Sequence, residues 1–159
     1  MKRRILALLL GLCLLLPVGA GASQEICGYP TADDLQELPK TVTRGAFLDA
    51  LAASSGEDVA DSAWIDMEDY FVDGADASDG VKWTFAKWIL NGDDTGENRA
   101  RLRLDDPITR QEAAVLLGRY LDYRYTDLPA GCGTGSPSMD NIADWAQRAV
   151  LQCWMYGVI

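Results

Sequence analysis

The chain has 159 residues, of which 48% are hydrophobic and 24% charged, and its net charge is −10. This length and composition are typical of one globular domain and exclude collagenous, coiled-coil and wholly disordered chains. A nucleic-acid partner would need an excess of Lys and Arg to neutralise phosphates, so the acidic balance argues against one. The sequence has no histidine, which excludes Ser-His-Asp triads and His-ligated zinc sites.

Residues 1–22 have the pattern of a secretory signal peptide. Basic residues at 2–4 precede an almost unbroken apolar run at 5–16, and the small residues Ala20 and Ala22 form an A-x-A cleavage pattern. The apolar run is too short to span a bilayer of about 30 Å comfortably. We therefore expect cleavage after Ala22 and an exported chain without a membrane anchor. Its 24 acidic and 11 basic residues would leave a net charge of −13.

Export would place the remaining cysteines in a compartment where disulfides form. Cys132 lies in a Gly-rich loop and Cys153 lies near the end of a predicted helix, so a bridge between them would close a short loop. Such a bridge would stabilise the fold by about 3 kcal/mol. Cys27 is an equal partner for either residue, and three small buried thiols are the remaining interpretation. No C-x-x-C pair is present, so no zinc site is predicted.

The hydrophobic periodicity predicts a mainly α-helical fold. Residues 23–41 hold Gly and Pro among polar residues and are interpreted as a linker with one short helix at 33–38. The acidic, turn-rich segment 54–80 and the loop 93–106, which contains one extended stretch, separate longer helices. The four longer helices are predicted at 43–53, 81–90, 109–121 and 141–156.

Two parts of the chain repeat the same order of features. In each part an apolar-Thr-Arg triplet opens a helix, an aromatic-x-Asp triplet follows, and a second helix ends before two aliphatic residues. The two copies are Val42-Thr43-Arg44 with Phe71-Val72-Asp73 and Trp88-Ile89-Leu90, and Ile108-Thr109-Arg110 with Tyr125-Thr126-Asp127 and Gly157-Val158-Ile159.

This pattern resembles the S-layer homology module of bacterial surface proteins. In that family an F-x-D opens the unit, a Trp-Ala helix ends at G-I-I-x-G, and an F-x-P-x-x-x-I-T-R-x-E segment starts the closing helix. A fairly complete copy spans 71–122 and includes Ile108-Thr109-Arg110-Gln111-Glu112, while 42–70 and 123–159 are partial copies. The chain departs from the family at Trp88, where the family prefers Gly, and it offers fewer than the usual three units.

The resemblance implies short helix pairs joined by loops, and a protein of the bacterial cell wall or S-layer. It implies non-covalent attachment to an acidic, for example pyruvylated, cell-wall polysaccharide. Arg110 would be the main anion contact and Arg44 its counterpart in the preceding unit. The alternative is a secreted, disulfide-containing module that binds a protein partner on the same helical scaffold. Under either interpretation we expect no enzymatic activity and no cofactor, and a glycan-active enzyme is the least favoured alternative. The acidic turns at 73–80 and 91–94 lack the spacing of a calcium loop, so no metal ligand is predicted there, and calcium binding stays an open alternative.

The residues alone give further candidates. Thr43 is suited to cap a helix, and Thr109 with Glu112 forms a capping box, so these residues are explained without a ligand. Arg110 lies at the first position of a predicted helix, where the positive helix end disfavours its charge. A bound anion nearby would offset this repulsion. The alternative is that Arg110 is an ordinary surface arginine.

Alternation along the loop after residue 98 suggests a basic face. An extended segment would present Arg99, Arg101 and Arg103 together for an acidic glycan, unless they pair with neighbouring acids. Trp83 is a candidate groove residue for stacking on a sugar, with packing in the core as the alternative.

Overall fold

The structure is a computed structural model that describes residues 41–96, 98–125 and 137–158. The expected signal peptide and the short helix at 33–38 therefore lie outside the described residues, as do Cys27 and Cys132. The described part is mainly helical, as predicted, and its extended pairing consists of isolated bridges. Its elements are α3 (Arg44–Ser55), η1 (Val59–Ser62), η2 (Met67–Asp69), α4 (Asp79–Ala86), α5 (Arg110–Arg124) and α6 (Asp144–Met155), where η marks a 3-10 helix.

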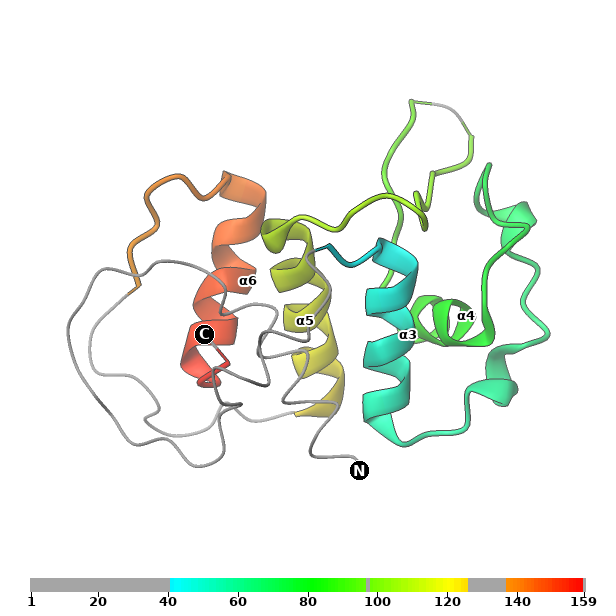
Figure 1. Cartoon of the computed structure of the whole chain (residues 1–159), viewed down its shortest axis with the longest axis horizontal. Coiled ribbons are helices and arrows are strands. Elements are labelled where there is room, and N and C mark those ends of the chain that lie inside the picture. Colours follow the sequence, from blue (N-terminus) through cyan, green and yellow to red (C-terminus); the bar gives the residue numbers. More distant parts are fainter. Residues whose placement is uncertain (1–40, 97, 126–136, 159) are drawn as a thin grey trace.

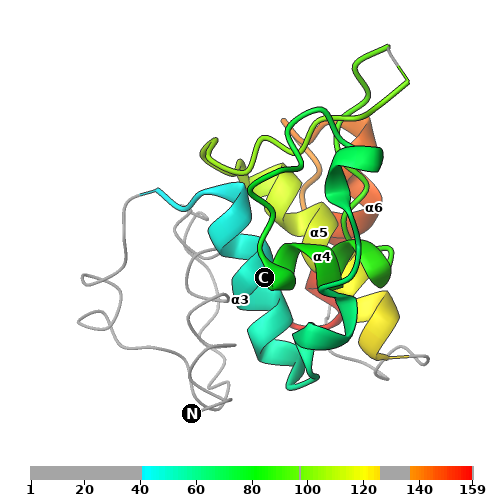
Figure 2. The same ribbon diagram turned by 90° about the vertical axis from the view of Figure 1, so that its right-hand side faces the viewer.

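Figure 1 shows α6, α5 and α3 side by side, with α4 seen end-on against α3. The view turned by 90° shows α4 lengthwise, running across the direction of the other helices (Figure 2). Helix α3 packs mainly against α4, and α5 packs mainly against α6, while a smaller contact joins α3 to α5. Each helix that begins with Thr-Arg thus pairs with the helix that follows it in the sequence.

The core forms between these helix pairs. Phe47, Leu48 and Leu51 are fully buried because their spacing places them on one side of α3. Ala113, Leu116, Leu117, Tyr120 and Leu121 form the matching stripe on α5.

Side chains start three of the helices as capping groups. Thr43 accepts a hydrogen bond from the amide of Ala46, and Ser78 accepts one from Val81, both at 3.2 Å. At α5 the expected capping box is present, because Glu112 also accepts from the Thr109 amide at 2.8 Å. These local bonds fix where the Thr-Arg helices begin.

The helix predicted at 81–90 is shorter at its end than expected. Helix α4 stops at Ala86, and Trp88 adopts a left-handed backbone with φ of 60°. The amides of Ile89 and Leu90 both donate to the carbonyl of Thr84, which closes the turn. Trp88 is consequently turned outward and is 82% exposed.

The loop between α4 and α5 is tied to the rest of the fold. Asp93 and Arg101 exchange backbone hydrogen bonds of 2.8 and 2.9 Å, which makes a small hairpin that projects from the helices in Figure 1. Further along, the Arg44 amide donates to the carbonyl of Asp106 at 2.9 Å. The start of α3 and the approach to α5 therefore lie side by side.

Candidate functional site

Arg44 is held inside the protein. Its exposed fraction is 4%, and its Nη1 lies 2.9 Å from Oε1 of Glu112. Its Nε donates to the carbonyl of Leu102 at 3.0 Å, and Nη2 lies 3.7 Å from Asp93. A guanidinium buried and paired in this way cannot reach a polymer at the surface. The structure corrects the expectation for Arg44, whose role is to join α3 to α5.

The carboxylate of Glu112 is the centre of this ionic network. One oxygen accepts from Nη groups of Arg44 and Arg103 at 2.9 and 2.6 Å, and the other accepts from the amide and hydroxyl of Thr109. Burial raises the pKa of Glu112, but these hydrogen bonds and the charge of Arg44 outweigh burial and hold the pKa below its usual range. Glu112 is therefore both a helix cap and a counter-ion.

Arg103 turns toward the same network. Its backbone has a φ of 54°, which interrupts the extended stretch. Its Nη2 lies 2.5 Å from Asp93 and 2.6 Å from Glu112, and Nη1 lies 3.5 Å from Asp106. Arg99 instead donates to the carbonyl of Glu68 at 2.9 Å. The predicted face of three aligned guanidinium groups is therefore not formed, and Arg103 pairs with neighbouring acids.

Arg101 differs from these arginines. Its side chain is exposed, and within the described part of the chain no hydrogen bond or ion pair holds its guanidinium. It lies at a cavity of about 370 Å³, which we call the arginine cleft. The cleft is lined by Asp73, Ala75, Asp76, Arg101, Arg103, Leu104, Asp105 and Asp106.

Other contacts already occupy several polar groups of the arginine cleft. The carboxylate of Asp73 accepts from the amides of Leu102 and Arg103 at 2.7 and 3.0 Å, which shapes the cleft wall. Arg103 is committed to the Glu112 network. The cleft consequently offers the cation of Arg101 beside the carboxylates of Asp76 and Asp105. Such a set can bind one acidic group together with several hydroxyl groups.

The aromatic-x-Asp repeat includes Asp73 and so marks this residue in the sequence. The repeat does not predict that the Asp73 carboxylate binds the loop that carries Arg101. The bonded residues lie 29 and 30 positions apart, a separation at which no local spacing rule applies.

Arg110, the main anion contact implied by the resemblance, begins α5 on an exposed side and does not line the arginine cleft. The structure thus brings Arg101 and Arg103 to one cavity, and Arg44 and Arg103 to one carboxylate. It does not gather all four arginines around one site.

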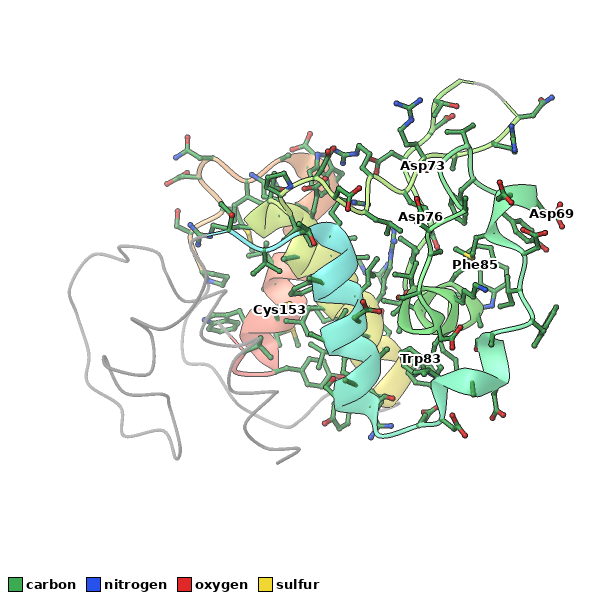
Figure 3. All side chains as sticks on the ribbon, turned by 45° about the vertical axis from the view of Figure 1, so that its right-hand side comes forward. Asp69, Asp73, Asp76, Trp83, Phe85 and Cys153 are labelled. Atoms are coloured by element: carbon green, nitrogen blue, oxygen red, sulfur yellow. The ribbon has the colours of Figure 1, made fainter. Side chains whose placement is uncertain are left out.

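Trp83 belongs to the core, which corrects its assignment as a groove residue. It is 1% exposed and packs edge-on against Tyr123, with ring centroids 5.7 Å apart (Figure 3). It lies on the inner side of α4 with Val81 and Thr84, so the helix itself directs it inward.

Cys153 is buried in the interface of the last two helices, with its sulfur 3.6 Å from the carbonyl oxygen of Ala114. Its two candidate partners, Cys132 and Cys27, lie outside the described residues, so a disulfide at Cys153 stays a prediction.

Two other kinds of site, a metal centre and a membrane span, have no candidate in the residues that the structure describes. No group of three or more cysteine, aspartate or glutamate side chains there is placed to hold a metal ion. No helix there has the length and apolar character needed to cross a bilayer. Comparisons of the chain with family models, with curated proteins and with solved structures find no significant match.

Proposed function

We propose that this chain is an exported bacterial surface protein that binds an acidic cell-wall polysaccharide through the arginine cleft. Arg101 is the anion contact in this proposal, in place of Arg44 and Arg103. The observation that carries it is an exposed guanidinium without a partner in the described chain, placed at a concave surface beside carboxylates. A guanidinium can bind a carboxylate through two parallel hydrogen bonds, and carboxylates accept from sugar hydroxyls.

Two features of the fold support the resemblance to S-layer homology modules. Both Thr-Arg helices pair with the helix that follows them. Trp88 has a φ of 60° at a position where that family prefers Gly, the residue best suited to a left-handed backbone.

The charges of the cleft favour a sparsely charged ligand. Asp73, Asp76, Asp105 and Asp106 surround its two arginines, so a dense polyanion would be repelled. A mostly neutral sugar chain with one acidic substituent would place its charge at Arg101 and its hydroxyls at the carboxylates. Screening over about 8 Å at physiological salt limits the repulsion by the rest of the acidic protein.

Sedimentation with bacterial sacculi that carry a pyruvylated polymer tests the proposal. The wild-type chain should sediment with intact sacculi and stay in solution with sacculi from which the polymer has been chemically removed. Arg101→Gln should weaken binding by roughly tenfold, the effect of losing a hydrogen bond to a charged group.

Arg148→Gln is the matched control, because Arg148 is exposed on α6 and does not line the cleft. It should bind like the wild type, and both variants should keep the wild-type melting temperature. Undiminished binding by Arg101→Gln would refute the proposed contact. Binding that survives polymer removal would refute the polysaccharide and favour a protein partner.

A further inference from the structure

A second cavity lies next to the arginine cleft. It has a volume of about 260 Å³ and contains Trp64, whose exposed fraction is 83%. We call it the tryptophan cleft. It is lined by Ala63, Trp64, Ile65, Asp66, Met67, Glu68, Gly74, Ala75 and Lys82.

The two clefts meet at Ala75, which lines both of them. Ala75 belongs to the loop 73–76, and Figure 3 shows Asp73 and Asp76 of this loop close to each other. Ala75 is exposed and common to both linings, so a ligand that bridges the two clefts would cross the molecule at this residue.

The loop 73–76 is held from both sides, so this arrangement is fixed. On one side Asp73 accepts from the amides of Leu102 and Arg103. On the other side Gly74 lies against the backbone of Met67, where an added Cβ would come within 2.5 Å of the carbonyl carbon and oxygen. Only glycine permits that close approach, which sets the position of Ala75 between the clefts.

The tryptophan cleft offers the groups that bind a neutral sugar. The exposed indole of Trp64 presents an apolar face, and one side of a pyranose ring presents apolar C–H groups that pack on such a face. The carboxylate of Glu68 is exposed beside it to accept from sugar hydroxyls, while Lys82 is occupied by the carbonyl of Ala63 at 3.1 Å. The cleft therefore combines one exposed aromatic side chain with polar groups, which suits a ligand rich in hydroxyl groups.

We propose that Trp64 forms a second saccharide contact. The acidic sugar binds at Arg101, the chain crosses Ala75, and a neighbouring neutral pyranose stacks on Trp64. This inference rests on the proposed function and narrows its ligand, since recognition then requires an oligosaccharide that contains both kinds of sugar.

Titration with the polymer released from the same sacculi tests this contact, followed by tryptophan fluorescence and by sedimentation. Trp64→Ala should weaken binding about three- to tenfold, in the range of an aromatic contact, and should remove most of the fluorescence change. Trp64→Phe should keep most of the affinity because it keeps an aromatic face. Ala75→Trp should block the passage between the clefts and weaken binding at least as much as Trp64→Ala.

Trp145→Ala is the matched control, because Trp145 is 60% exposed on α6 and lines neither cleft. It should bind like the wild type. If Trp64→Ala and Ala75→Trp both bind like the wild type while Arg101→Gln binds weakly, the second contact is refuted and the proposed function stands. If the wild-type chain does not bind the polymer, both proposals are refuted.

Discussion

Glu112→Gln is the substitution that most directly tests the ionic network between α3 and α5. It keeps the shape of the side chain but removes the charge opposite Arg44, which is 4% exposed. An amide also has one acceptor oxygen, whereas the carboxylate uses both oxygens to accept from Arg44, Arg103 and Thr109. The substitution therefore leaves a buried cation underpaired and disrupts the capping box of α5.

We expect this change to lower the free energy of unfolding by about 3 kcal/mol, the lower end of the range for breaking a buried ion pair. The lower end applies because the Glu112 side chain keeps 17% exposure and Asp93 remains 3.7 Å from Arg44. Urea unfolding followed by circular dichroism measures it, and the midpoint should fall by roughly 1–3 M.

Asp105→Asn is the control for removing a carboxylate from the same loop. Asp105 is exposed and has no hydrogen bond or ion pair within the described residues, so its substitution should leave the midpoint nearly unchanged. A loss below 1 kcal/mol for Glu112→Gln, at an unchanged denaturant slope, would refute a structural role for the network. A double-mutant cycle of Glu112→Gln and Arg44→Met measures the coupling energy between the two side chains directly.

Two further predictions concern the same fold. The folded protein lowers the pKa of Glu112 below its unfolded value, so the ionised carboxylate stabilises the fold fully above about pH 4.3. That contribution is lost as the pH falls through the lower folded pKa. In urea titrations between pH 7 and pH 3, the free energy of unfolding should therefore fall less for Glu112→Gln than for the wild type. Trp88→Gly should stabilise the fold by about 0.5–1 kcal/mol because glycine tolerates the φ of 60° and Trp88, 82% exposed, packs little; thermal unfolding measures this, and a lower melting temperature would contradict it.

Local signals in the sequence located the helices well. The Thr-x-x-Glu spacing at Thr109 produces a capping box, and Thr43 caps α3, because both depend on atoms only three residues apart. The sequence pattern predicts a helix up to residue 90, whereas α4 ends at Ala86. The pattern of large apolar residues continues through Trp88, and periodicity cannot show that the backbone there turns left-handed.

Spacing rules that act over three or four residues cannot predict the ion pairs. Arg44 and Glu112 are 68 positions apart, so their contact follows from how α3 and α5 pack. Alternation along 99–103 predicted one basic face, but the φ of 54° at Arg103 redirects its side chain to Asp93 and Glu112. Only the folded structure shows which of these arginines are paired and which is exposed at a cavity.

The position of Glu112 explains why an apolar-Thr-Arg motif does not by itself mark an anion-binding arginine. A cation at the start of α3 is disfavoured by the positive helix end, and an anion is favoured at the start of α5. Because the two helix starts lie side by side, one carboxylate caps α5 and neutralises Arg44 at α3. Arg44, the arginine of the α3 motif, thus forms a buried ion pair that stabilises the fold. In the proposed function the anion contact is instead Arg101, which belongs to no helix motif and lies on the loop that Asp73 holds.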